Sequence, residues 1–285
     1  MITLAMALCL QAETVTLKYG TSALPKDKVY AETRMGIKIE GADALANFVR
    51  SMHPLLSLEK LVLRAEGTHA SPGAKKHRFE YDEARIEARY DDEDLELDFQ
   101  RGLPPEGLEK DKAKQMMWYL AAAGRSFSLS EKGEYRGDDP NQDQTGEAMD
   151  LISLAAIRLP DGPVKAGDAW EKSWKGERTK KGENKYFNFT QKSKVEKIEA
   201  KDGKTLVTIS AELTGKGEGP KNPAAEEERA TAEGKSTLVL EAETGRIVSS
   251  EGSGKVVMYF RNAGDGGQKQ ELTLTFSCGG KLTPR

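Results

Sequence analysis

The feature that most constrains this chain is an alternation of apolar and polar residues, with a period of two, that recurs along most of it. Between Lys28 and Glu40, most odd-numbered residues are apolar and most even-numbered residues are polar. Successive side chains of a β-strand point to opposite faces of a sheet, so this pattern predicts a long strand with one buried and one solvated face. A strand of this length favours a large, curved sheet.

The second half of the chain repeats the alternation in successive segments joined by turn residues. Asp202-Gly203 and Thr244-Gly245 are dipeptides typical of β-hairpin turns, and 91–94 is predicted to be an acidic turn. Because strands joined by successive hairpins run in opposite directions, we predict an antiparallel sheet. Residues 215–234 are rich in Gly, Pro, Ala and Glu and are predicted to form a mobile loop between two strands. The alternating segments are 170–175, 186–198, 205–213, 236–243, 246–260 and 270–278.

Three segments carry instead the three- and four-residue spacing of an amphipathic helix. They are 41–52, 107–123 and 146–158, and Gly124 is a suitable end for the second. We therefore predict a mainly β (α+β) fold with two to three helices packed on one face of the sheet. The sheet is expected to be a large curved antiparallel sheet or a half-open barrel, similar to periplasmic lipoprotein carriers, and a closed barrel is the alternative.

The chain has 285 residues, which suits one large β domain or two smaller ones. Because alternating segments continue through most of the chain, we predict a single β-rich domain over residues 13–285. A division into two lobes near Pro160 stays open, since Pro160 lies in a sharp turn.

Residues 1–12 are uncharged and mostly apolar. An apolar run that ends in a small residue resembles the hydrophobic region of a signal peptide, here with cleavage after Ala12, although the usual basic residues before it are missing. The run is too short to span a bilayer. We therefore predict a secreted or periplasmic protein without a transmembrane segment, and a buried first strand is the alternative. Loss of Cys9 with the signal peptide leaves Cys278 alone, so no internal disulfide is possible.

The charges exclude one class of partner. The chain has 43 Lys and Arg residues against 46 Asp and Glu residues, a net charge of −3, and the two signs are interleaved. A nucleic-acid-binding protein needs a basic patch or stripe. We therefore predict no nucleic-acid partner and a solvated surface of mixed charge.

No arrangement of residues typical of catalysis stands out. The chain has no Gly-x-Ser-x-Gly nucleophile motif, no phosphate-binding loop and no closely spaced pair of histidines. Residues 139–150 place oxygen donors at positions typical of a calcium-binding loop, but Gln144 replaces the turn glycine and Asp150 replaces the bidentate glutamate. We predict no catalytic residue, no metal and no cofactor, and calcium binding at 139–150 stays open.

The segment 159–170 has the sequence Leu-Pro-Asp-Gly-Pro-Val-Lys-Ala-Gly-Asp-Ala-Trp. It resembles a recurring segment of uncharacterised exported bacterial proteins of planctomycete type, in which a Leu-Pro turn precedes Val-Lys-x-Gly-Asp-x-Trp. The hairpin at 244–249 resembles a later part of the same family. The resemblance covers the second half of the chain well and the first half only by layout. It implies a secreted or periplasmic, β-rich protein and says nothing of chemistry.

The candidate binding residues are Met116, Met117 and Trp118 on the predicted second helix, and Trp170 at a strand start. Flexible methionines and aromatic rings can line or cover a groove, and they can equally fill a core. The leading hypothesis is non-catalytic binding, in the concave face, of a lipid, another apolar or amphipathic molecule, or an envelope protein. One alternative is an envelope scaffold that uses its sheet edges and the 215–234 loop. Another is an enzyme with an unrecognised carboxylate site.

Overall fold

The computed structural model describes residues 14–20, 27–52, 57–73, 76–100, 111, 114–115, 126–137, 157–180, 183–218, 230–261 and 269–284. These residues form one antiparallel sheet of twelve strands, so the prediction of a mainly β protein is confirmed. The strands are β1 (Asp27–Gly41), β2 (Leu58–Gly73), β3 (Lys76–Tyr90), β4 (Glu93–Gln100), β5 (Ser126–Leu129), β6 (Tyr135–Gly137), β7 (Ala169–Lys180), β8 (Glu183–Lys201), β9 (Lys204–Glu218), β10 (Thr231–Glu241), β11 (Ile247–Arg261) and β12 (Lys269–Pro284).

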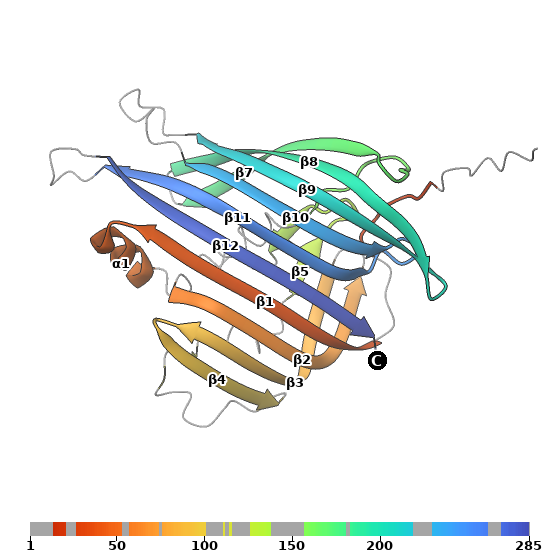
Figure 1. The fold of residues 1–285 in the computed structure, drawn as a ribbon, viewed down its shortest axis with the longest axis horizontal. Helices are drawn as coiled ribbons and strands as arrows, with labels where there is room; N and C mark the ends of the chain where they lie inside the picture. Colours follow the sequence, from red (N-terminus) through yellow and green to blue (C-terminus); the bar gives the residue numbers. More distant parts are fainter. Residues whose placement is uncertain are drawn as a thin grey trace, which may run out of the picture.

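The strands follow the order β6-β5-β3-β2-β1-β12-β11-β10-β9-β8-β7 (Figure 1). β4 and β5 share one edge of β3, which pairs with β5 through residues 76–78 and with β4 through residues 83–90. β1 and β12, which lie far apart in the chain, are neighbours in the middle of this order. Strands from both sides of Pro160 therefore belong to the same sheet.

The tight turns lie where the sequence predicts them. Asp202 and Gly203 both have positive φ (51° and 74°), the backbone that a two-residue turn between β8 and β9 needs. Gly245, with φ of 70°, turns the chain between β10 and β11. Asp91 and Asp92 also have positive φ and join β3 to β4, so the turn is confirmed at these two residues, whereas Glu93 and Asp94 already belong to β4.

The sheet is curved (Figure 1). β2 and β3 bend away from the viewer near their shared turn, and β5, which pairs with that end of β3, lies behind the central strands. The β5–β6 turn is hydrogen-bonded to two irregular segments, 14–20 and 157–164: the Tyr19 amide donates to the Glu131 carbonyl (3.0 Å) and the Leu159 amide to the Lys132 carbonyl (2.9 Å). These two segments therefore connect the β5–β6 turn with the strands on which they pack.

The sheet does not close into a barrel in the part of the chain that the structure describes, so the closed alternative is wrong for these strands. β6 and β7, at the two ends of the order, each pair with a single strand. The irregular segments 14–20 and 157–164 form backbone hydrogen bonds with one another, as in the antiparallel bridge between Val15 and Val164 (2.8 Å in both directions). They do not add a strand to either edge of the sheet.

The described residues contain one helix with defined ends, α1 (Asp43–Met52), which is fewer than the two to three predicted. It matches the predicted segment 41–52, and Asp43 and Arg50 lie at the ends where the helix dipole favours their charges. Of the predicted helix 107–123, the structure describes residues 111, 114 and 115, where the Gln115 amide donates to the Asp111 carbonyl (2.9 Å). The rest of that segment lies outside the described residues.

The predicted helix 146–158 is wrong at its end, and the remainder of it lies outside the described residues. Residues 157 and 158 are not helical. The reason is tertiary: Ile157 and Leu159 are both fully buried, and the Leu159 amide is already bonded to the β5–β6 turn. Alternate residues of an extended chain can both point into a core in this way.

The glycine-rich stretch 215–234 is not a loop throughout. β9 continues to Glu218 and β10 begins at Thr231, while residues 219–229 lie outside the described residues. Gly215 pairs directly with Phe189 of β8, and a Cβ on Gly215 would lie 2.7 Å from the Phe189 ring. The ring lies over the glycine and supplies the packing that the glycine lacks. A residue type that usually marks a turn is therefore part of a strand here.

Buried apolar side chains gather in three clusters. Cluster 1 joins segments 14–20 and 157–164 to β8, β9 and β10. Cluster 2 lies on β2, β3 and β4. Cluster 3 joins Ala46 of α1 to β1, β10, β11 and β12. The strand register places all three clusters on one face of the sheet, which we call the inner face.

Candidate functional site

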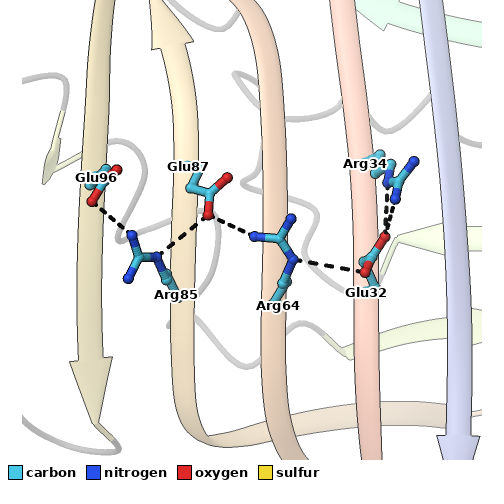
Figure 2. A network of polar contacts seen from close by, with 6 residues as sticks. All are labelled: Glu32, Arg34, Arg64, Arg85, Glu87 and Glu96. Atoms are coloured by element: carbon cyan, nitrogen blue, oxygen red, sulfur yellow. Dashed lines mark hydrogen bonds and ion pairs between the residues drawn. The ribbon is translucent and has the colours of Figure 1, made fainter.

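The outer face of the sheet is charged. Figure 2 shows a chain of ion pairs that crosses β4, β3, β2 and β1 with alternating sign. Each pair is partly or largely exposed, so each contributes little to stability, and together they keep this face solvated. The members, in order, are Glu96, Arg85, Glu87, Arg64, Glu32 and Arg34.

One row of directly paired residues shows how the inner face changes across the sheet. Its two ends are buried and belong to clusters 1 and 2, whereas Ser250 and Gly280 in the middle are half-buried and Thr33 is exposed. The middle of the inner face is therefore lined by short side chains between two groups of large ones. From β8 to β4 the row is Val195, Ile209, Leu238, Ser250, Gly280, Thr33, Leu63, Ile86 and Leu97.

Short residues recur in the neighbouring rows of β10, β11 and β12. All of them are half-buried, and the register places them on the inner face. Cys278 lies beside Gly252, and burial raises the pKa of its thiol, which keeps it protonated and unreactive. We call the set the glycine–serine patch: Gly234, Ser236, Ser250, Gly252, Gly254 and Gly280.

The segment 159–170 supports cluster 1. Gly167, with φ of 90°, donates its amide to the Val195 carbonyl, and the Val195 amide donates to Asp168. The Asp168 carboxylate accepts from the Lys165 amide (3.0 Å). These bonds fix the turn that leads into β7, so the glycine and aspartate of this segment have structural roles.

Trp170 is the one predicted binding residue that the structure describes. Its ring packs against cluster 1, and its indole N–H donates to the carbonyl oxygen of Arg158 (2.7 Å). Packing and a satisfied N–H account for a half-buried tryptophan. Met116, Met117 and Trp118 lie outside the described residues, so their place relative to Trp170 is not described.

Trp170→Phe is expected to lower the free energy of unfolding by about 1 to 2 kcal/mol, because the Arg158 carbonyl loses its side-chain donor while most of the ring packing remains. Urea unfolding followed by circular dichroism measures this loss. An unchanged free energy of unfolding would contradict this structural role of the Trp170 indole.

Arg158 has surroundings that are unusual for a cation. Its side chain is 24% exposed, and its guanidinium carbon lies 4.0 Å from the centroid of the Trp174 ring. Trp174 in turn contacts Phe189, with ring centroids 5.5 Å apart. A guanidinium over an indole face is a cation–π contact. Burial lowers the pKa of Arg158, but an arginine remains charged at neutral pH.

The Arg158 guanidinium has few partners for its five N–H donors. Its nearest carboxylate among the described residues is Glu134, whose Oε1 lies 3.9 Å from Nη1, too far for a hydrogen bond. The backbone of Arg158 is held on both sides, because its amide donates to Gln191 Oε1 (2.7 Å) and its carbonyl accepts from Trp170. The side chain is thus positioned by its backbone and its stack, and its donors remain available.

Two lysines add positive charge near Arg158. Lys172, on the same face of β7 as the two tryptophans, bonds to Asp161 (2.5 Å) and thereby lowers the pKa of that carboxyl group. Lys132 donates to two backbone carbonyls at 3.3 and 2.6 Å. These three cations face two carboxylates, Glu134 and Asp161, which are both largely exposed. Arg158, Lys172 and Lys132 thus bring positive charge to this corner of the inner face.

Ser193 is a buried hydroxyl without a hydrogen-bond partner in the structure, and its residue is 3% exposed. It lies on the inner face, where it pairs with Trp170 on one side and Ala211 on the other. Buried hydroxyls are normally hydrogen-bonded, so an unpaired one marks a place that a water molecule or a ligand atom can satisfy.

The described residues include no group of three or more His, Cys, Asp or Glu that could hold a metal ion. None of the helices described there has the length and apolar character needed to cross a membrane. The segment 139–150, for which calcium binding stayed open, lies outside the described residues. Comparison with family models and with curated proteins gives no match to this chain. The fold itself defines the class: an open antiparallel sheet with a charged outer face and an apolar inner face.

Arg158, Trp174 and Phe189 were missed by sequence reasoning. Trp174 carries a signal, since it follows Trp170 by an even number of residues in an alternating strand and so shares its face. Phe189 carries a similar signal within the segment 186–198. Arg158 carries none, because its position over Trp174 depends on contacts between segments far apart in the chain.

Proposed function

We propose that this protein is a non-catalytic binding protein that holds an amphipathic ligand with an apolar chain on its inner face, with the curved sheet acting as a half-open barrel. The observation that carries the proposal is the glycine–serine patch. It is half-buried, it is lined by short side chains apart from the Phe276 ring, which lies over Gly254, and it lies between clusters of large buried ones. An apolar chain laid on such a surface loses contact with water without displacing a packed core.

The charge distribution supports an amphipathic ligand over a wholly apolar one. Trp174 on β7 and Ala232 on β10 belong to one row of paired residues, three strand spacings or about 14 Å apart. The inner-face residues between them, Phe189 and Gly215, are apolar or small, and Gly234 is the next inner-face residue of β10 after Ala232. An alkyl chain can lie across these strands while its polar end reaches the positive corner around Arg158. The predicted export would place such a protein among the lipids of the cell envelope.

Gly280→Leu is expected to weaken the binding of dodecyl maltoside, a neutral single-chain probe, by about tenfold or more, because the new side chain occupies the β12 side of the patch, beside Ser250. A Cβ at Gly280 meets nothing nearer than the Ser250 Oγ at 3.7 Å, so a side chain can begin there without a clash, and urea unfolding establishes that the variant is folded. Isothermal titration calorimetry measures the affinity.

Gly279→Leu is the matched control. Gly279 is the next residue of β12 and faces outward, opposite Arg34 and Glu251, and a Cβ there meets nothing nearer than 3.6 Å. It is expected to bind the probe like the unaltered protein. Equal affinity for the two variants would contradict a site at the patch, and absence of binding by the unaltered protein would favour the envelope scaffold instead.

A further inference from the structure

We propose that the Arg158 guanidinium, held over Trp174, binds the oxyanion head group of the ligand, so that the ligands of this protein are single-chain amphiphiles with a carboxylate or phosphate head. This inference rests on the proposed function and names its ligand class. In this arrangement the head group of the ligand binds at the corner formed by β7, β8 and segment 157–164. The apolar chain of the ligand lies across β9 and β10.

The first argument is hydrogen-bonding capacity. A guanidinium presents its donors in a planar fork that matches two oxygens of a carboxylate or phosphate. Glu134 is the only carboxylate within 4.0 Å of the Arg158 side chain among the described residues, and at 3.9 Å it makes no hydrogen bond to it. Glu134 is also 58% exposed, so water solvates it well without Arg158. The fork is therefore free to receive a ligand's oxygens.

The second argument is preorganisation. The Arg158 backbone is fixed by Gln191 and Trp170, and the guanidinium is stacked on Trp174. Because these contacts already restrict the long side chain, little conformational entropy is lost when an anion binds. The partial burial of the guanidinium matters as well, since it strengthens a charge–charge interaction that water would otherwise screen.

The third argument is continuity between the charged and apolar surfaces. Trp174 contacts Phe189, and Phe189 packs against cluster 3 over Gly215. A head group bound at Arg158 thus has an apolar path that begins at the two rings and leads across the sheet. Lys172 and Lys132 add positive charge on the same corner, which disfavours a cationic head group.

The test compares head groups on one alkyl chain in the full-length protein. Isothermal titration calorimetry is done with dodecanoate, dodecyl phosphate, dodecyl maltoside and dodecyltrimethylammonium, below their micelle concentrations, and with acetate as a head group without a chain. We expect the two anions to bind at least about tenfold more tightly than the maltoside, and the cation to bind most weakly.

Two variants assign the preference to Arg158. Arg158→Gln should remove the preference for anions over the maltoside while maltoside affinity stays within about twofold, and Arg158→Lys should keep part of it, because the charge remains but the planar fork is lost. Arg85→Gln, on the outer face, is the control and should preserve the preference. Urea unfolding of each variant establishes that it is folded.

The outcomes separate this inference from the proposed function. Equal binding of all four chain-bearing probes, or an anion preference that survives Arg158→Gln, would overturn the role of Arg158 and leave the proposed function standing. Acetate binding as tight as dodecanoate binding would support an anion site at Arg158 and overturn the proposed function. Failure of every chain-bearing probe to bind would overturn both.

Discussion

Gly245→Ala is expected to lower the free energy of unfolding by about 2 to 5 kcal/mol. Two costs combine at this position. Gly245 has φ of 70°, which an alanine adopts only with strain. The added Cβ would also clash with the Gly20 nitrogen and the Lys18 carbonyl oxygen, which are backbone atoms that no side-chain rotation can move away.

The clash at Gly245 acts on the segment 14–20. The Gly20 amide donates to the Gly245 carbonyl (2.7 Å), so the turn and the segment are bonded where the methyl group would intrude. Leu17 and Tyr19 of this segment are buried in cluster 1, and the Tyr19 hydroxyl donates to the Ile157 carbonyl (2.8 Å). If the segment moves away from the turn, this part of cluster 1 loses its cover.

Alanine substitutions at two other glycines distinguish the cost of the backbone strain at Gly245 from the cost of the steric clash there. Gly203 has φ of 74° but nothing within 4 Å of its Cβ position, so Gly203→Ala should cost about 1 kcal/mol. Gly162 also has open space around it and no positive φ, so Gly162→Ala should change stability by less than about 0.5 kcal/mol. Urea unfolding of the three variants measures the series. A Gly245→Ala loss no larger than that of Gly203→Ala would show that segment 14–20 does not pack against this turn.

Glu241→Gln is expected to lower the free energy of unfolding by about 3 kcal/mol at pH 7, because it leaves a buried cation without its counter-charge. The Glu241 side chain is 5% exposed and accepts from Arg246 (2.8 Å) and Lys204 (3.1 Å) on the same oxygen. Arg246 is itself largely buried, so it cannot recover its hydration when Glu241 loses its charge. Chemical denaturation measures the difference.

The effect of Glu241 depends on pH in a defined direction. Burial raises the pKa of Glu241, but the hydrogen bond from Lys204 and the charge of Arg246 outweigh it, so the pKa in the folded protein lies below the ordinary value of 4.5. A carboxylate with a lowered pKa stabilises the fold above the unfolded-state pKa, and the contribution is lost as pH falls through the folded-state pKa. The stability difference between the unaltered protein and Glu241→Gln should therefore be constant near pH 7 and shrink below pH 4.5.

An exposed ion pair provides the control for Glu241. Glu212 pairs with Lys235 at 3.1 Å, and both side chains are largely exposed. Glu212→Gln should cost less than about 1 kcal/mol. A double-mutant cycle between Glu241→Gln and Arg246→Gln should give a coupling energy of at least about 1 kcal/mol. No measurable coupling, or equal costs for Glu212→Gln and Glu241→Gln, would show that the buried pair does not stabilise the fold.

The strands and tight turns were predictable because they depend on local chemistry. The alternation between Lys28 and Glu40 predicted β1, and Asp202-Gly203 predicted the turn of the β8–β9 hairpin. Errors arose where tertiary contacts override local preference. Gly215 belongs to a strand because the Phe189 ring lies over it, and Ile157 is extended because it fills cluster 1.

The candidate site was less predictable than the fold. Trp170 was chosen from the sequence as a large ring at a strand start, and the structure gives it a partner in the Arg158 carbonyl. Arg158 itself looked like the last residue of a helix. Its stack on Trp174 joins segment 157–164 to β7, and no sequence pattern describes a contact of that kind.

By itself, the sequence of this protein determined that the chain forms long antiparallel strands with one charged and one apolar face, because side-chain alternation and turn chemistry act between residues close in the chain. Only the tertiary structure decided that β1 pairs with β12, that the sheet stays open, and that short residues from β10, β11 and β12 form one patch. The register between distant strands is set by the packing of the whole inner face, and a one-residue shift would turn every one of these side chains to the opposite side.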